Sequence, residues 1–313
     1  MTPYLFLLLG LAILLFGGKI LVDGATSIAF KLGMSSGLIG LTVVAFGTSA
    51  PELLVSVNAA LKGNSDISIG NVVGSNIANI ALVLGLSGLF YPILINRNQL
   101  RFDYTLMIIV TIIFYLLSLN GLIGIWKGIL LFGGFLGFNF YLFRNIGKGI
   151  VDENEIVEEE IEEVKNYSWF ISAALFFGGI VGLYAGSELL VENAVTISRE
   201  FGVSERVIGV TIIAIGTSLP ELITSIMAAL SKRTDLALGN ILGSNIMNIL
   251  SIIGLTAIIK PITVSPEFLS SDYLWMLGFT LVLFPLMKTK MKISLFEGTI
   301  LLLGYCLYIF FLL

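Results

Sequence analysis

Polar residues divide the sequence into long stretches that are almost continuously apolar. A helix needs about 20 mostly apolar residues to cross the hydrocarbon core of a bilayer. By this measure the pattern predicts ten spanning helices, and therefore an all-α polytopic membrane protein. The ten predicted spans are 3–22, 36–61, 68–90, 104–119, 121–143, 168–191, 204–230, 237–258, 273–286 and 294–312.

The predicted spans fall into two groups of five, separated by a polar segment. We therefore expect a first five-helix repeat at 1–143, an acidic linker at 144–167 and a second repeat at 168–313. The chain is 57% hydrophobic and 12% charged, whereas soluble domains average about 25% charged residues. Eight acidic residues lie within 152–163, so the net charge of −4 is a local property of the linker. The run is typical of a solvated connector and does not indicate a basic partner or nucleic acid.

The two groups are copies of each other at an offset of 169 residues. From Val22 to about Ile93 the first group aligns with the second without a gap. Each copy contains an odd number of predicted spans, so the second must enter the membrane from the opposite side. Inverted repeats of this kind are typical of secondary transporters, which bind substrate at the midplane between the repeats.

Lysine and arginine are enriched in cytoplasmic loops of membrane proteins. Placing the N-terminus outside assigns eleven of these residues to the cytoplasmic side and five to the outside. We therefore predict a multi-pass protein of the cell membrane with both termini outside and the linker 144–167 in the cytoplasm.

Two glutamates, Glu52 and Glu221, occupy the middle of the second and seventh predicted spans. A charged side chain at the bilayer centre costs roughly 2.5–3.5 kcal/mol on insertion scales and normally faces a partner or a water-filled cavity. No basic residue stands beside either glutamate, so the pair indicates a bound cation. Without that cation the two ionised carboxylates repel each other, and we expect protons to compete for the site.

Each glutamate follows a proline, and this predicts a kink in helices 2 and 7 at the centre of the molecule. Pro51 lacks an N–H group, and its ring crowds the carbonyl of Gly47. We expect free carbonyl oxygens between Ala45 and Thr48 as cation ligands, together with the hydroxyls of Thr48 and Ser49. The seventh span repeats this set as Ala214, Thr217, Ser218 and Glu221.

The third and eighth spans add further oxygen donors. Ser75 and Asn79 share one helix face, as do Ser244 and Asn248, because four residues separate each pair. Carboxylate, hydroxyl, amide and carbonyl oxygens favour hard cations such as Ca²⁺, whereas soft metals favour sulfur and imidazole ligands. We expect the nearby polar and small residues to pack helices together. These are Gly70, Gly74, Gly239 and Gly243, and also Asn71, Asn76, Asn240 and Asn245, which we expect to bond neighbouring helices.

The sequence Gly-Thr-Ser-x-Pro-Glu occurs twice, and each copy is followed by Gly-Asn-x-x-Gly-Ser-Asn-Ile-x-Asn. This pattern resembles the two α-repeats of sodium/calcium exchangers in the cation/calcium exchanger superfamily, in a compact prokaryotic form. The resemblance implies antiport of about three Na⁺ for one Ca²⁺ by alternating access, with no cofactor and no obligatory protein partner. It implies that Glu52, Glu221, Thr48 and Thr217 hold calcium. Sodium sites are implied at Ala45, Ser75, Ala214 and Ser244, with Ser49 and Ser218 close by and Asn79 and Asn248 at the centre.

Other functions remain open at this stage. A proton/calcium antiporter and a potassium-dependent sodium/calcium antiporter share the same scaffold, although Asn248 stands where potassium-dependent relatives carry Asp. A cation channel is disfavoured by the inverted repeat. An intramembrane hydrolase using Ser49 or Ser218 is disfavoured because the chain contains no histidine to act as a base. We therefore expect a transporter and not an enzyme.

Overall fold

The computed structural model describes residues 2–145, 167–202 and 214–312. Within these ranges, eight helices are long and apolar enough to cross a membrane, or up to nine if one bent pair is counted as a single span. The all-helical membrane architecture is thus confirmed. The predicted span 204–230 lies partly outside the described residues, as does nearly all of the linker 144–167.

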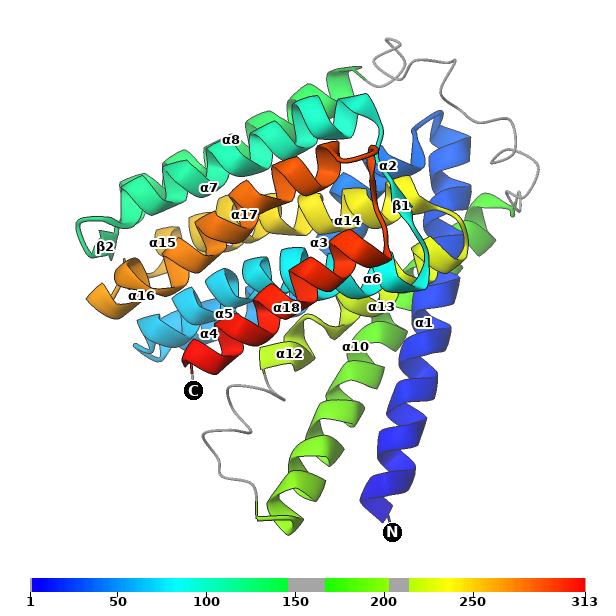
Figure 1. Ribbon diagram of the computed structural model, residues 1–313, viewed down its shortest axis with the longest axis horizontal. Coiled ribbons are helices and arrows are strands. Elements are labelled where there is room, and N and C mark those ends of the chain that lie inside the picture. Colours follow the sequence, from blue (N-terminus) through cyan, green and yellow to red (C-terminus); the bar gives the residue numbers. More distant parts are fainter. Residues whose placement is uncertain (1, 146–166, 203–213, 313) are drawn as a thin grey trace.

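Two long helices, α1 (Thr2–Leu32) and α10 (Trp169–Glu200), lie side by side (Figure 1). Both continue well past the predicted ends of their spans, because a charged residue that marks a bilayer boundary does not end a helix. A Cβ atom on any of three α1 glycines would lie within 3.0 Å of α10 backbone. The contacts are Gly10 with Leu190, Gly17 with Leu183 and Gly24 with Phe176. The partner numbers fall as the α1 numbers rise, so the two helices are antiparallel.

The second predicted span is broken at Ser49. Its first part comprises α2 (Ser36–Ile39), the π-helical turn η1 (Gly40–Val44) and α3 (Ala45–Thr48), and its second part is α4 (Ala50–Leu61). The two parts meet at 45°. The matching residues of the other repeat form α12 (Ala214–Thr217) and α13 (Leu219–Leu230) on either side of Ser218.

The break lies later in the chain than the sequence suggested. Residues 45–48 stay helical, and the Ala45 carbonyl accepts hydrogen bonds from the Ser49 amide at 3.0 Å and the Thr48 hydroxyl at 3.3 Å. The expectation of a free carbonyl at Ala45 is therefore wrong. Pro51 sits in the first turn of α4, where a missing N–H costs nothing because that group has no partner inside the helix.

The most buried part of the fold is a pair of matching helical segments. The first is α5 (Ser65–Ala78), η2 (Asn79–Val83) and α6 (Leu84–Phe90). The second is α14 (Thr234–Met247), η6 (Asn248–Ile253) and α15 (Gly254–Ile259). These spans are 78% and 89% buried, whereas the other spanning helices are 22–33% buried. They form the centre of the bundle, and the others surround them.

The remaining helices surround this centre and are joined by two short antiparallel strand pairs. Strand β1 (Ile93–Leu94) pairs with β4 (Lys292–Ile293), and β2 (Leu122–Ile123) pairs with β3 (Ile262–Thr263). Each pair therefore joins one half of the sequence to the other. The outer helical elements are η3 (Gln99–Asp103), α7 (Tyr104–Ser118), α8 (Ile125–Asn145), α16 (Pro266–Ser270), α17 (Asp272–Lys288) and α18 (Leu295–Leu312).

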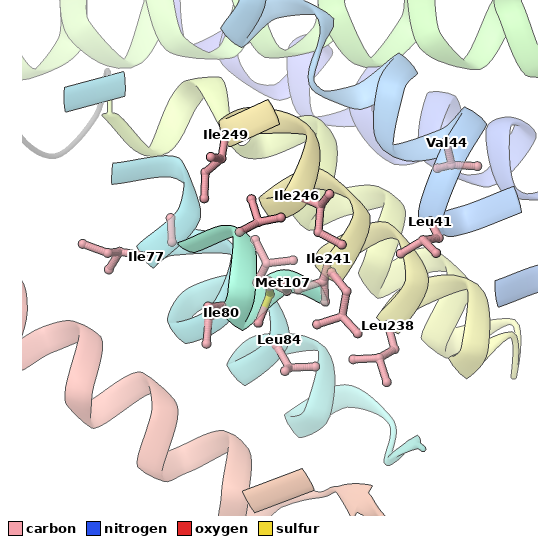
Figure 2. Close-up of a cluster of buried hydrophobic side chains, with 14 of the residues drawn as sticks. Leu41, Val44, Ile77, Ile80, Leu84, Met107, Leu238, Ile241, Ile246 and Ile249 are labelled. Atoms are coloured by element: carbon pink, nitrogen blue, oxygen red, sulfur yellow. The ribbon is translucent and has the colours of Figure 1, made fainter. Parts of the chain in front are cut away.

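Apolar side chains from both halves pack against each other around the central helices (Figure 2). The first half contributes Leu41, Ile77 and Ile80, and the second contributes Ile241 and Ile249, all at most 1% exposed. This packing leaves little freedom at the centre, so polar groups that lie there occupy fixed positions.

Candidate cation-binding site

Both mid-span glutamates lie in the first turn of a helix and are fully buried. Glu52 is the third residue of α4 and Glu221 is the third residue of α13, each just after a helix break, and each is 0% exposed. The N-terminus of a helix carries a partial positive charge, which favours a carboxylate there. The two breaks thus give each acidic side chain a local electrostatic support that an uninterrupted helix would not provide.

The two halves bring these acidic turns together. The Ser49 hydroxyl, three residues before Glu52, donates a hydrogen bond to Glu221 Oε1 at 2.8 Å. Residues that are 172 positions apart in sequence therefore form one acidic centre between the repeats.

Several buried polar atoms at this centre have no hydrogen-bond partner among the described residues. Both carboxylate oxygens of Glu52 and Oε2 of Glu221 are in this state. Buried polar groups in folded proteins are nearly always paired, so each exception asks for an explanation. Four more of the predicted ligands show the same property, namely Ser218, Ser244, Asn79 and Asn248. Apart from the Asn79 amide nitrogen, all of these atoms are oxygens, and they fit a hard cation.

Asn79 and Asn248 each begin a π-helical turn, η2 and η6, at matching positions of the two repeats. Single π-turns occur frequently at functional sites. The Asn248 amide donates to Asn76 Oδ1 at 3.0 Å, which leaves the Asn248 oxygen without a partner. These π-turns could not be predicted from the pattern of apolar residues, because their residues are as apolar as the helices around them.

The remaining predicted ligands lie near the acidic centre. Thr48 is 1% exposed, and its hydroxyl lies 3.3 Å from both the Ala45 carbonyl and Asn240 Oδ1. Ala45 itself is fully buried. Ala214 and Thr217 are the first and last residues of α12, the segment that precedes Glu221. Ser75 and Thr217 line a cavity beside the centre.

Two serines that were not predicted as site residues accept hydrogen bonds from asparagines of neighbouring helices, and each lies one turn after a glutamate. The Asn71 amide donates to the Glu52 carbonyl at 3.0 Å and to Ser56 Oγ at 2.9 Å. In the other repeat the Asn240 amide donates to Ser225 Oγ at 3.1 Å. A signal was present in the sequence, because a serine stands four residues after the glutamate in both repeats.

The packing expectations for the neighbouring residues have mixed outcomes. Asn71, Asn76 and Asn240 bond other helices as expected, whereas the Asn245 amide bonds a carbonyl of its own helix at 2.8 Å. A Cβ atom on Gly239 or Gly243 would overlap backbone carbonyls at 37 and 41, which confirms tight packing there. Gly74, the counterpart of Gly243, has no neighbour among the described residues, but the segment 206–213 that corresponds to residues 37–44 lies outside them, so the packing expectation at Gly74 stays a prediction.

A family of known proteins matches this chain over both of its repeats. The family model described as "Sodium/calcium exchanger protein" matches residues 2–144 and 171–313. The two matched stretches are offset by the same 169 residues that relate the repeats. The chain belongs to the sodium/calcium exchanger family. The family assignment from the sequence motifs is thus confirmed.

The similarity to individual members of the sodium/calcium exchanger family extends over nearly the whole chain. The "Putative antiporter CaxA" of Alkalimonas amylolytica is 40% identical, over 96% of this chain and 95% of that protein. The "Sodium/calcium exchanger MaX1" of Methanosarcina acetivorans is 32% identical, over 96% of each. A solved structure of the sodium-calcium exchanger NCX_Mj, soaked without Na⁺ and Ca²⁺, superposes with a TM-score of 0.85 at 30% identity, covering 99% of both chains. The chain is therefore a multi-pass cation/Ca²⁺ antiporter.

Proposed function

We propose that this exchanger couples inward movement of about three Na⁺ to outward movement of one Ca²⁺, or the reverse, by alternating access. The observation that carries the proposal is the buried pair Glu52 and Glu221. Among the described residues, one of their four carboxylate oxygens has a hydrogen-bond partner and three have none. A divalent cation neutralises two such carboxylates. Replacing one Ca²⁺ by three Na⁺ moves one net charge per cycle, so the exchange is electrogenic.

The proposed calcium ligands are the carboxylates of Glu52 and Glu221 and the carbonyls of Thr48 and Thr217. Sodium takes flanking positions at Ala214, Ser75 and Ser244, with Ser49 and Ser218 beside them. The Ala45 carbonyl already accepts two hydrogen bonds and is not part of this set. Asn79 and Asn248 lie between, at the start of their π-turns. Ca²⁺ accepts 6–8 oxygen ligands in flexible geometry, and this set provides enough of them.

The proposed architecture is ten spans arranged as two inverted repeats, 1–143 and 168–313, joined by the linker 144–167. Support comes from the antiparallel contact of α1 with α10, which are the first helices of the two repeats. Further support comes from helix boundaries that recur at a constant offset, such as α5 and α14. We place the protein in the cell membrane with both termini outside.

Transport in proteoliposomes tests the proposed exchange. Vesicles loaded with Na⁺ should take up radioactive Ca²⁺ when diluted into Na⁺-free buffer, and protein-free vesicles should not. A potassium ionophore sets the membrane potential, and uptake that responds to this potential shows that charge moves. Saturable uptake under a Na⁺ gradient supports the exchanger. Uptake driven only by a proton gradient, or only with K⁺ present beside Na⁺, would assign the other couplings instead.

A further inference from the structure

The short helix α12, which precedes Glu221, is held from the side by α10 (Figure 1). The hydroxyl of Ser187 on α10 donates a hydrogen bond to the Gly216 carbonyl of α12 at 2.7 Å. One turn further along α10, Val191 lies so close to Gly216 that a Cβ atom there would overlap the valine side chain. Ser187 is 8% exposed, so the bond is shielded from water and lipid. Two consecutive turns of α10 therefore fix one residue of α12.

The Gly216 carbonyl needs a partner from outside its own helix. The last carbonyls of a helix have no partner within that helix. Pro220, which stands four places after Gly216, has no N–H group to offer. Gly216 is buried, and a buried carbonyl without a partner costs free energy comparable to a lost hydrogen bond. Ser187 supplies that partner, and the bond fixes the peptide group that joins Gly216 to Thr217.

The residue that corresponds to Ser187 in the first repeat cannot make this bond. At the offset of 169 residues that relates the repeats, the counterpart of Ser187 is Gly18, which has no side chain to donate. α10 also reaches Gly47, the counterpart of Gly216, but it does so with the side chains of Ile180 and Phe176. The contact of α10 with the second helix break is therefore a directional hydrogen bond, whereas its contact with the first is apolar.

We propose that Ser187 is a positioning residue for the calcium site and acts through the Gly216 carbonyl. The inference rests on the proposed function, in which the carbonyl of the next residue, Thr217, is a calcium ligand. Groups that hold the ligands of a metal ion orient them, and the loss of such a group weakens binding of the ion. Selectivity between related cations depends on the size and flexibility of the site. Ser187 should therefore support affinity for Ca²⁺ and discrimination against the larger Sr²⁺.

The test compares Ser187→Ala and Ser187→Cys with Ser172→Ala as the matched control. Cysteine has nearly the volume of serine but is a weak donor, so this variant separates loss of the bond from loss of packing. Ser172 lies on α10 about four turns before Ser187. It is fully buried and shares a hydrogen bond of 2.8 Å with Ser27 of α1, so its substitution removes a buried bond of the same helix away from α12. Uptake of Ca²⁺ and of Sr²⁺ is measured in Na⁺-loaded proteoliposomes, and melting temperatures are measured in detergent.

We expect both variants of Ser187 to raise the KM for Ca²⁺ by about three- to tenfold, as the loss of one hydrogen bond implies. The KM for Sr²⁺ should rise less, so that the ratio of the two constants moves toward one, while the maximal rate stays unchanged. Ser172→Ala should leave both constants at their wild-type values, even where it lowers the melting temperature.

Three results would overturn the positioning role and leave the exchange function standing. The first is a wild-type KM for Ca²⁺ in Ser187→Ala or in Ser187→Cys. The second is an equal rise of the KM for Ca²⁺ and for Sr²⁺, and the third is the same shift in Ser172→Ala. If wild type takes up no Ca²⁺ on a Na⁺ gradient, both the positioning role and the proposed exchange are overturned.

Discussion

The residues that define the centre are a matched pair of acids supported by neutral donors. Asn71 donates to the Glu52 carbonyl and Asn240 donates to Ser225, one turn after Glu221, while three of the four carboxylate oxygens have no partner among the described residues. Support of this kind orients ligands without competing for the cation. The asparagine amides therefore hold the helices in place, whereas the carboxylates bind the cation, and substitution of a carboxylate should affect transport more than folding.

Removing either carboxylate should abolish transport while sparing the fold. In Glu52→Gln or Glu221→Gln the site keeps one negative charge, which no longer balances a divalent cation. We expect Ca²⁺ exchange to fall to the level of empty vesicles, with elution on size exclusion and melting temperature close to wild type. Robust exchange by either variant would contradict the assignment of these two residues.

Transport should also weaken in acid. Without a cation between them the two carboxylates repel each other, and a bound proton relieves that repulsion. Protons therefore compete with Ca²⁺, and the competition grows as the pH falls. Initial rates of Ca²⁺ uptake at pH 5 to 8 and at several Ca²⁺ concentrations should show a KM that rises toward acidic pH. Uptake that is constant over this range would count against competition at the carboxylates.

Much of the centre could be predicted from the sequence, because the repeat doubles every polar position inside an apolar background. Glu52, Asn79 and their mates are conspicuous for that reason. Ser56 and Ser225 were missed because a serine inside a membrane helix is usually a packing residue. Their role depends on the rotation of α5 and α14, which sequence spacing does not give.

At the scale of helices, close backbone contact joins the two repeats. α14 lies against α2 and η1 with backbone contact at Gly239 and Gly243. Close approach of two backbones requires glycine, since any Cβ atom would overlap the facing carbonyls.

This contact gives a testable pair of substitutions. Gly243→Ala places a methyl group into the Leu41 backbone, which cannot move aside as a side chain would, and overpacking of this kind costs about 1–3 kcal/mol. Gly133→Ala adds the same group to α8, where no described residue lies within 4 Å of the Cβ position. Thermal unfolding in detergent should show a lower melting temperature for Gly243→Ala and little change for Gly133→Ala. Equal melting temperatures for the two variants would contradict the close contact at Gly243.

The helices could be predicted where a continuous apolar run defines them, whereas their ends and breaks could not be placed as well. The spans at 68–90 and 237–258 match α5–α6 and α14–α15 closely, because a buried apolar run has few alternatives. The ends of α1 and α10 were not predictable, since a helix continues beyond the bilayer boundary at no cost in hydrogen bonding. The break at Ser49 was expected near Pro51, but its position depends on which carbonyls the helix retains.

At the scale of the molecule, charge along the loops predicts the orientation in the membrane. Lys62, after α4, should lie outside, and Lys288, at the end of α17, should lie inside; both are exposed. In a Cys306→Ala background, which removes the single cysteine, a membrane-impermeant maleimide should label Lys62→Cys in intact cells. It should label Lys288→Cys only after permeabilisation. The reverse pattern would place both termini in the cytoplasm.

The bond between Gly37 and Asp235 joins residues 198 positions apart. α2 and η1 therefore enter the bilayer long before α14, the helix that covers their glycine face, has been translated. Until then that face has only lipid or the insertion machinery against it. A nascent chain halted after its first half should accordingly be sensitive to protease and prone to capture by membrane quality control, and supplying the missing half in trans should rescue it.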